Sequence, residues 1–192
     1  EVFDVAYKWL GRIPGGLAVA TVVASTVLAA MVGVIGAAVV TMALVALPSM
    51  LRRGYSPVLA VGTVMAGGTL GILIPPSVLA IVYGLVANQS VGELYLGSVF
   101  PGLVLSGLYI LFSVGYALLN PKAAPRLSPE ETPTWSERWR ALRSIWSPLV
   151  LIFLVLGTIF LGLAAPTEAA AIGAFGAMVV AAIHRRLSWT IL

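Results

Sequence analysis

The stretch VMAGGTLGILIPPSVLAIVY, residues 64–83, decides the fold of this chain. It lies in an apolar run from about residue 58 to 87, yet it contains three glycines followed by Pro75, Pro76 and Ser77. Each proline lacks a backbone N–H and its ring crowds the preceding turn, so a helix must break near Ile74. Inside a bilayer, irregular backbone survives only where protein covers it or where it lines a wet cavity.

Two interpretations of this break are open. Two half-helices that meet at an unwound segment near the middle of the membrane form the ion and substrate sites of secondary transporters. The other interpretation is a proline-kinked helix whose small residues allow close packing against neighbours. The stretch by itself favours neither.

The composition predicts an all-α, polytopic membrane protein. A membrane span needs roughly 20 apolar residues, and this chain has several runs of that length. The Lys and Arg residues lie in the connections between the runs, which is typical of a topology signal and not of nucleic-acid binding. The absence of Cys excludes disulfides, thiolate catalysis and Cys-ligated metal within the chain. The apolar runs are 17–47, 58–87, 99–119 and 148–183.

The first long run predicts a re-entrant helical hairpin over residues 17–47, after a cytoplasmic amphipathic lead-in at 1–16. As one helix, its roughly 31 residues would extend about 46 Å, too long for one span of a roughly 30 Å core and too short for two. Gly33 and Gly36 lie at its middle, where the chain reverses most easily. Basic residues flank both ends, which places both ends in the cytoplasm. A single strongly tilted helix is the alternative.

The remaining runs fit the same orientation. We expect a broken transmembrane helix at 58–87, a transmembrane helix at 99–119 and two more at 148–183. Between them, 120–147 is predicted to be a cytoplasmic linker followed by an interfacial arm helix. One face of that arm carries Trp135, Trp139, Leu142 and Trp146, whereas Arg138, Arg140 and Arg143 lie largely elsewhere. Such a helix is suited to the membrane interface, either as a bracing or docking surface or as a generic linker.

Thr167 and Glu168 stand at the start of the last predicted helix. A hydroxyl and a carboxylate at that position favour helix capping, so we give both residues a structural role. No catalytic motif is present: the sequence has no HExxH, no GxSxG and no phosphate-binding loop. The single histidine, His184, adjoins two arginines at a predicted membrane edge. We therefore expect neither an enzyme nor an organic cofactor.

Two motifs, GTLGILIPPS (68–77) and APTEAAAIGAFGA (165–177), together resemble the large membrane subunit of tripartite ATP-independent periplasmic (TRAP) transporters. Three further stretches support the resemblance, which covers nearly the whole chain: PGGLAVATV (14–22), ALPSMLRRGYSP (46–57) and YLGSVFPGLVLSGLY (95–109). The resemblance implies a fragment of an elevator-type transporter: the middle of a subunit about twice this length, without the second hairpin.

The resemblance also implies a function. The implied function is sodium-driven symport in the bacterial inner membrane. Such a symporter accepts a carboxylate solute from a periplasmic binding protein and works with a small membrane subunit. Possible sodium ligands are then Gly33, Gly36 and Thr41 of the hairpin and Gly68, Thr69 and Gly71 of the broken helix. Substrate contacts are expected at Pro75, Pro76 and Ser77.

One departure from the family pattern opens an alternative. Val32 and Ile35 occupy hairpin-tip positions where the family commonly has hydroxyls, and their side chains offer no ligand to a cation. Backbone carbonyls at Gly33 and Gly36 remain available there. The alternative is a truncated, transport-incompetent relative that packs against other integral membrane subunits as a structural component.

Overall fold

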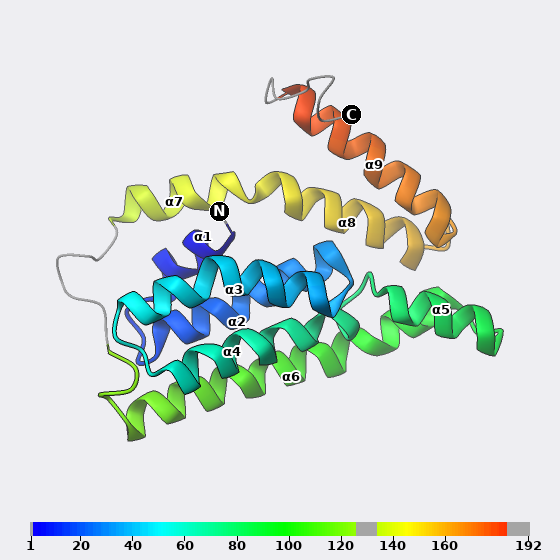
Figure 1. Ribbon diagram of the computed structural model, residues 1–192. Helices are drawn as coiled ribbons and strands as arrows, with labels where there is room; N and C mark the ends of the chain where they lie inside the picture. Colours follow the sequence, from blue (N-terminus) through cyan, green and yellow to red (C-terminus); the bar gives the residue numbers. More distant parts are fainter. Residues whose placement is uncertain (1, 126–133, 184–192) are drawn as a thin grey trace.

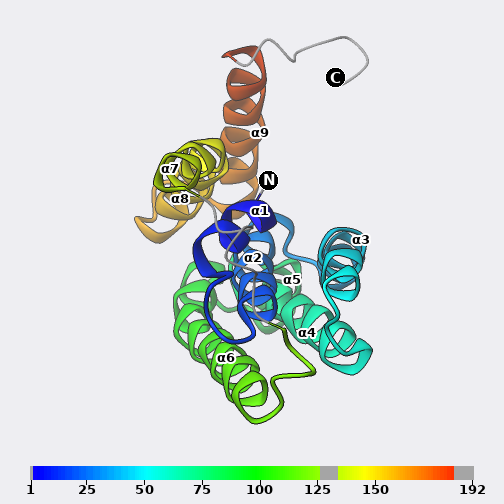
Figure 2. The same ribbon diagram turned by 90° about the vertical axis from the view of Figure 1, so that its left-hand side faces the viewer.

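The computed structural model describes residues 2–125 and 134–183, and these residues form helices and no strand. Figures 1 and 2 show a bundle of roughly aligned helices with α7 and α8 along one side and α9 projecting from it. The helices are α1 (Val2–Leu10), α2 (Gly16–Val32), α3 (Ile35–Arg52), α4 (Pro57–Thr69), the 3-10 helix η1 (Leu70–Ile72), α5 (Val78–Ala87), α6 (Val91–Leu119), α7 (Trp135–Ser144), α8 (Trp146–Phe160) and α9 (Pro166–Ile183).

Helix α2 is the centre of the bundle. In Figure 2 it lies among α1, α3, α4 and α6, and it contacts each of them. Its sequence is apolar around the whole circumference, which is typical of a helix buried on every side. Even its polar residues Thr21 and Ser25 are fully buried. The core of the molecule therefore forms around this helix.

The first long apolar run forms two helices joined by a tight turn, so the single tilted helix does not occur. Gly33 ends α2 with a φ of 65°, and its N–H donates to the carbonyl of Ala29. Only Gly33 and Val34 separate the two helices, and α3 runs back beside α2 (Figure 1). The left-handed conformation that closes α2 is one that glycine adopts without a steric penalty.

The second run is broken, as its prolines predict, but the helix ends earlier than expected. Helix α4 stops at Thr69 and not near Ile74, because a 3-10 turn already tightens the chain at Leu70–Ile72. Regular helix resumes at Val78. The carbonyls of residues 73–76 accept no backbone hydrogen bond from the described residues. We call residues 70–77 the break.

Helix α6 is longer than the predicted 99–119 span. It begins at Val91, where the Ser90 hydroxyl accepts a hydrogen bond from the Glu93 N–H at 3.4 Å, and it continues through Pro101 to Leu119. The stretch before residue 99 is too polar to count as part of an apolar run, yet a capped helix start needs no apolar residues. Residues 91–98, which precede the predicted span, are therefore helix as well.

The arm helix α7 packs against α1. The Trp9 ring makes edge contacts with Trp135 and Trp139, at centroid distances of 6.1 and 6.0 Å. Arg138, which was predicted to lie largely off the aromatic face of the arm, is buried, with its guanidinium 5.3 Å from the Trp135 ring centroid. Residues 126–133 of the predicted linker, and His184 with its two neighbouring arginines, lie outside the described residues.

By length and composition, α3 and α6 can each cross a membrane, and α7 with α8 can form a third span bent by 43°. The other apolar helices are shorter; α8 alone has 15 residues. Both ends of the hairpin lie at one end of the bundle. The Leu17 N–H donates to the Tyr55 hydroxyl at 3.2 Å, and the Ser56 N–H donates to the Ala123 carbonyl at 2.9 Å. The starts of α2 and α4 thus adjoin the residues that follow α6.

Candidate functional site

The tip of the α2–α3 hairpin lies directly on the break. The Gly33 carbonyl accepts a hydrogen bond of 3.3 Å from the N–H of Val78, the first residue of α5. A Cβ added to Gly33 would collide with the Pro76 carbonyl oxygen. A Cβ on Gly71 would meet the Val34 carbonyl carbon at 3.4 Å. The irregular backbone of one element therefore meets the irregular backbone of the other.

Apolar packing against α2 positions one face of the break. Leu70 and Ile74 are buried against Val22 and Ala29 of α2. Two residues before the break, Gly68 lies so close to α3 that a Cβ would collide with the Val39 side chain. The break is thus covered by α2 on one face, and its approach to the hairpin depends on small residues.

The structure brings together only some of the six predicted sodium ligands. Gly33 lies against Pro76 and Gly71 lies against Val34, both at the contact between the tip and the break, and Gly68 faces α3 one turn away. Gly36 lies in open space on α3, and Thr41 is exposed with its hydroxyl donating to the Ala37 carbonyl at 2.7 Å. The Thr41 hydroxyl is therefore bonded within its own helix, and the Cβ position of Gly36 faces no neighbour.

Thr69 faces the opposite side of the broken helix from the hairpin tip. Its hydroxyl donates to the Ala66 carbonyl at 2.7 Å, and its oxygen lies 3.2 Å from the Tyr109 hydroxyl of α6. Because the threonine proton is already committed to Ala66, Tyr109 is the donor in this pair. Thr69 thus joins the broken helix to α6.

Of the three predicted substrate residues, Pro76 lines a cavity beside the contact between the hairpin tip and the break. This cavity measures about 330 Å³ and lies between the hairpin tip, the break and the α8–α9 pair, with Met31, Tyr95, Ile152 and Pro166 among its lining residues. Pro75 is fully buried. The cavity is mostly apolar, so a polar ligand in it would depend on the hydroxyl and backbone groups at its edge.

Ser77 holds the second half-helix in place. It is fully buried, its hydroxyl accepts a hydrogen bond from the Ala80 N–H at 3.4 Å, and its carbonyl accepts one from the Tyr95 hydroxyl at 3.2 Å. With the Val78 N–H bonded to Gly33, two of the first three N–H groups of α5 are engaged. An anion at this helix start would compete with these two bonds.

The chemistry of the site is that of oxygen ligands. The described residues contain no cluster of three or more His, Cys, Asp or Glu side chains suited to a metal ion. The carbonyl oxygens recorded at this contact are those of Pro76 in the break and of Gly33 and Val34 at the hairpin tip. Unwound backbone carbonyls of this kind coordinate sodium in secondary transporters.

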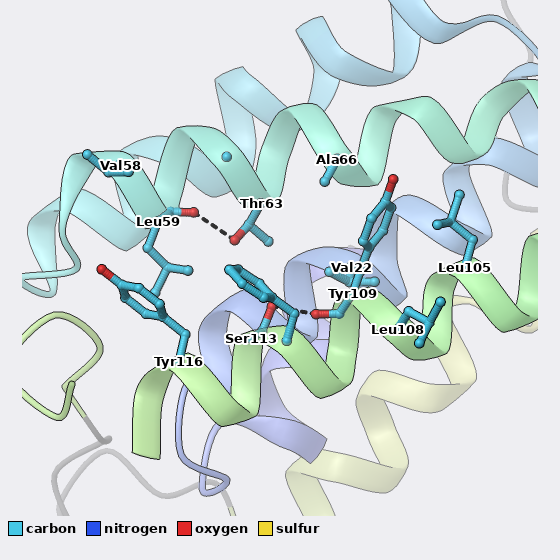
Figure 3. Close-up of a pocket in the computed structure, with 12 residues that line it drawn as sticks. Val22, Val58, Leu59, Thr63, Ala66, Leu105, Leu108, Tyr109, Ser113 and Tyr116 are labelled. Atoms are coloured by element: carbon cyan, nitrogen blue, oxygen red, sulfur yellow. Dashed lines mark hydrogen bonds between the residues drawn. The ribbon is translucent and has the colours of Figure 1, made fainter. Parts of the chain in front are cut away.

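A second cavity, of about 550 Å³, lies between α4 and α6 and does not include the predicted residues. Figure 3 shows its lining, in which the Thr63 hydroxyl donates to the Leu59 carbonyl and the Ser113 hydroxyl to the Tyr109 carbonyl. Both hydroxyls are thus satisfied within their own helices. The remaining lining is almost entirely apolar, which suits hydrocarbon and not an ion.

Sequence reasoning missed several polar residues around the break. Ser25 is buried on α2, where a Cβ on Gly67 would collide with its hydroxyl oxygen. Tyr95 and Tyr109 of α6 hold the two ends of the break, as the bonds to Ser77 and Thr69 show. The sequence contains one indication of the two tyrosines' shared position: Tyr95 and Tyr109 are separated by fourteen residues and so share one face of a helix.

At the last helix the structure separates two residues that were grouped as a cap. Helix α9 begins at Pro166, so Thr167 lies inside the first turn and is exposed. The Glu168 carboxylate accepts a hydrogen bond from the Ala165 N–H at 2.8 Å. Glu168 therefore satisfies a backbone donor just before the helix, while Thr167 makes no such bond.

Known proteins are similar in sequence to this chain over nearly its whole length. Residues 1–192 match the model of the family described as "Tripartite ATP-independent periplasmic transporter, DctM component". The C4-dicarboxylate TRAP transporter large permease protein DctM of Vibrio cholerae is 38% identical over 174 residues, covering 91% of this chain and 37% of that protein.

Two further relatives are similar. The DctM protein of Pseudomonas aeruginosa is 38% identical over 186 residues (96% of this chain, 42% of that protein), and the ectoine TRAP transporter large permease protein TeaC of Halomonas elongata is 33% identical over 171 residues (89% and 39%). The chain thus spans about two fifths of the length of these relatives. The chain belongs to the DctM family, the large membrane permease component of TRAP transporters.

Proposed function

We propose that this chain forms part of a sodium-coupled permease that imports an organic acid or related solute across the bacterial inner membrane. In this proposal a periplasmic binding protein delivers the solute, and a small membrane subunit completes the transporter. The relatives' names mention C4-dicarboxylates and ectoine, which supports a small organic solute that carries a carboxylate.

One observation carries the proposal: the hairpin tip touches the break. The bond from the Val78 N–H to the Gly33 carbonyl and the close approach of Gly33 to Pro76 bring two irregular backbone segments together. The carbonyls of residues 73–76 accept no backbone hydrogen bond from the described residues, and the Gly33 carbonyl at the tip accepts one from outside its own hairpin. A sodium ion bound between them would hold the tip and the break together, and this contact would differ between ion-bound and ion-free states.

The solute would bind beside this contact. The cavity lined by Met31, Pro76 and Tyr95 adjoins the break and the α8–α9 pair. A carboxylate placed at the start of α5 would meet the positive end of that helix after displacing the Gly33 bond. The chain matches the family model throughout, and no contact favours the structural-subunit alternative.

Uptake measured in liposomes containing the complete transporter tests the proposal. Solute uptake should follow an imposed sodium gradient and should cease when choline replaces sodium. Gly71→Val inserts a branched side chain between the break and Val34 and should abolish sodium-driven uptake. Gly62→Val, on α4 with open space around its Cβ position, is the matched control and should transport normally. Uptake indifferent to sodium, or retained in Gly71→Val, would contradict the proposal.

A further inference from the structure

Three residues on one face of α6 follow the break from end to end. Tyr95, Gly102 and Tyr109 are spaced seven residues apart, so they lie nearly in line along the helix with about 10 Å between neighbours. We call these three residues the α6 seam. Tyr109 contacts the residue just before the break, and Gly102 and Tyr95 contact successive parts of the break.

At one end of the α6 seam, Tyr109 holds the last residue of α4. Its hydroxyl donates to the Thr69 hydroxyl oxygen across 3.2 Å. Figure 3 shows the Tyr109 ring leaving α6 and extending toward α4 past Ala66. This bond fixes the point at which regular helix stops.

In the middle, Gly102 allows α6 to approach the break itself. A Cβ at Gly102 would lie 3.0 Å from Ile74 Cγ1 and 3.5 Å from the carbonyl carbon of Leu73. A larger side chain here would push against residues whose carbonyls are free of backbone hydrogen bonds. Gly102 thus lets α6 contact the break closely.

At the other end, Tyr95 holds the residue that caps α5. Its side chain is fully buried, and its hydroxyl donates to the Ser77 carbonyl at 3.2 Å. It also packs in one apolar cluster with Ile159 of α8 and Ala169 of α9. Tyr95 therefore connects the break to the helix pair on the far side of the cavity.

We propose that the α6 seam sets the length and shape of the break, with Tyr95 and Tyr109 as positioning residues for the carbonyls of residues 73–76. The two hydroxyls fix the half-helix ends, and Gly102 fixes how closely the intervening backbone approaches α6. The effect of the α6 seam on ion binding rests on the proposed transport function. The effect of the α6 seam on the backbone of the break does not depend on that function.

Hydrogen–deuterium exchange of the complete transporter tests the structural part. Tyr95→Phe and Tyr109→Phe each remove one hydroxyl and keep the ring, so exchange of the backbone amides of residues 70–74, 77 and 78 should rise about three- to tenfold in each. Tyr116→Phe, on the same helix beyond the α6 seam, is the matched control and should exchange like the unmodified protein. Gly102→Val should also raise exchange in the break, whereas Gly107→Val, with open space around it, should not.

Sodium-driven uptake by the same variants tests the functional part. In Tyr95→Phe and Tyr109→Phe the sodium concentration for half-maximal uptake should rise several-fold, with a smaller change in the maximal rate, because the ligands are displaced and not removed. Unchanged exchange in both tyrosine variants would overturn the role of the α6 seam. Raised exchange in a transporter whose unmodified form shows no sodium dependence would support the α6 seam and refute the proposed function.

Discussion

Gly33 meets three structural requirements at one position. It adopts a φ of 65°, its Cβ position lies against the Pro76 carbonyl, and its own carbonyl accepts the Val78 N–H. A side chain would violate the first two requirements and thereby weaken the third. The side chains of Val32 and Ile35 beside it offer no oxygen atoms, so the tip acts through its backbone.

Gly33→Ala should destabilise the protein measurably. A left-handed residue other than glycine costs about 1–2 kcal/mol, and the contact with Pro76 adds to this cost. Unfolding of the purified protein in detergent, followed by loss of helicity against denaturant, should show a lower midpoint.

Gly36→Ala is the matched control for this substitution, because Gly36 has no left-handed φ and no neighbour within 4 Å of its Cβ position. Its midpoint should equal or exceed that of the unmodified protein, since alanine favours helix. Equal midpoints for both variants would show that the tip does not press on the break.

The sequence located the turn at Gly33, but it did not indicate in which direction the side chains of Thr41 and Thr69 point. Gly33 lies at the turn because glycine tolerates the conformation that a reversal requires. Thr69 and Thr41 were grouped with it by residue type, yet one hydroxyl faces α6 and the other is exposed. The direction in which a helical side chain points depends on tertiary packing, which spacing within one helix does not report.

At the level of elements, the prolines located the break and the packing set its extent. Pro75 and Pro76 require a break before them, but η1 and the end of α4 at Thr69 depend on the close contacts of Gly68 and Gly71 with the hairpin. The length of α6 was also underestimated, because Ser90 caps a helix that begins in a polar stretch. Apolar runs therefore identified the helices better than they identified their ends.

The start of α7 should be sensitive to pH. The Thr134 backbone N–H at 2.8 Å, and then its hydroxyl at 3.1 Å, hold the pKa of Glu137 below its ordinary value. The stabilising contribution is therefore complete above the ordinary carboxyl pKa and is lost as pH falls through the lowered value. A spin label at Ser136→Cys should become more mobile over that range.

Glu137→Gln is the control for this titration, because the amide keeps the shape and cannot ionise. The label should then show the same mobility at every pH. A titration that persists in Glu137→Gln would assign the effect to another group.

The docking of α7 on α1 should depend on Trp9. Trp9→Ala removes two aromatic edge contacts, each contributing about 0.5–1.5 kcal/mol beyond area burial. The same label at position 136 should become more mobile. Trp146→Ala removes an exposed ring that makes no ring contact with the described residues, and it should leave the label unchanged. Equal mobility in both variants would place the anchor of α7 elsewhere.

At the level of the whole molecule, the connections that the sequence places in the cytoplasm lie at one end of the bundle. The basic turn after α3 and the segment after α6 lie together, as the Ser56–Ala123 bond shows. Tyr109, which marks the start of the break, lies about 15 Å along α6 from Leu119. With Leu119 at the membrane boundary, this is about half of a roughly 30 Å hydrocarbon core.

Single cysteines test this orientation, since the chain contains none of its own. Gln89→Cys, between α5 and α6, should react with a membrane-impermeant maleimide in intact cells, whereas Lys122→Cys should react only after the membrane is permeabilised. The reverse pattern would invert the topology.

The sequence predicted the all-α membrane fold, the hairpin and the broken helix, because glycine, proline and apolar length act locally. It did not predict the cavity between Pro76 and Pro166, or the cluster of Tyr95 with Ala169. These contacts join residues more than seventy positions apart. Such pairs follow from how whole helices pack, which no local pattern encodes.

The most direct test of the central claim is the thermal stability of the purified complete transporter titrated with sodium chloride, with choline chloride holding ionic strength constant. Ligand binding to the folded state raises stability in a saturable way. We predict a saturable rise in the unfolding midpoint with sodium, absent with choline, lost in Gly71→Val and kept in Gly62→Val. Equal midpoints in the two salts, or a sodium response that survives in Gly71→Val, would contradict ion binding at the contact between the hairpin tip and the break.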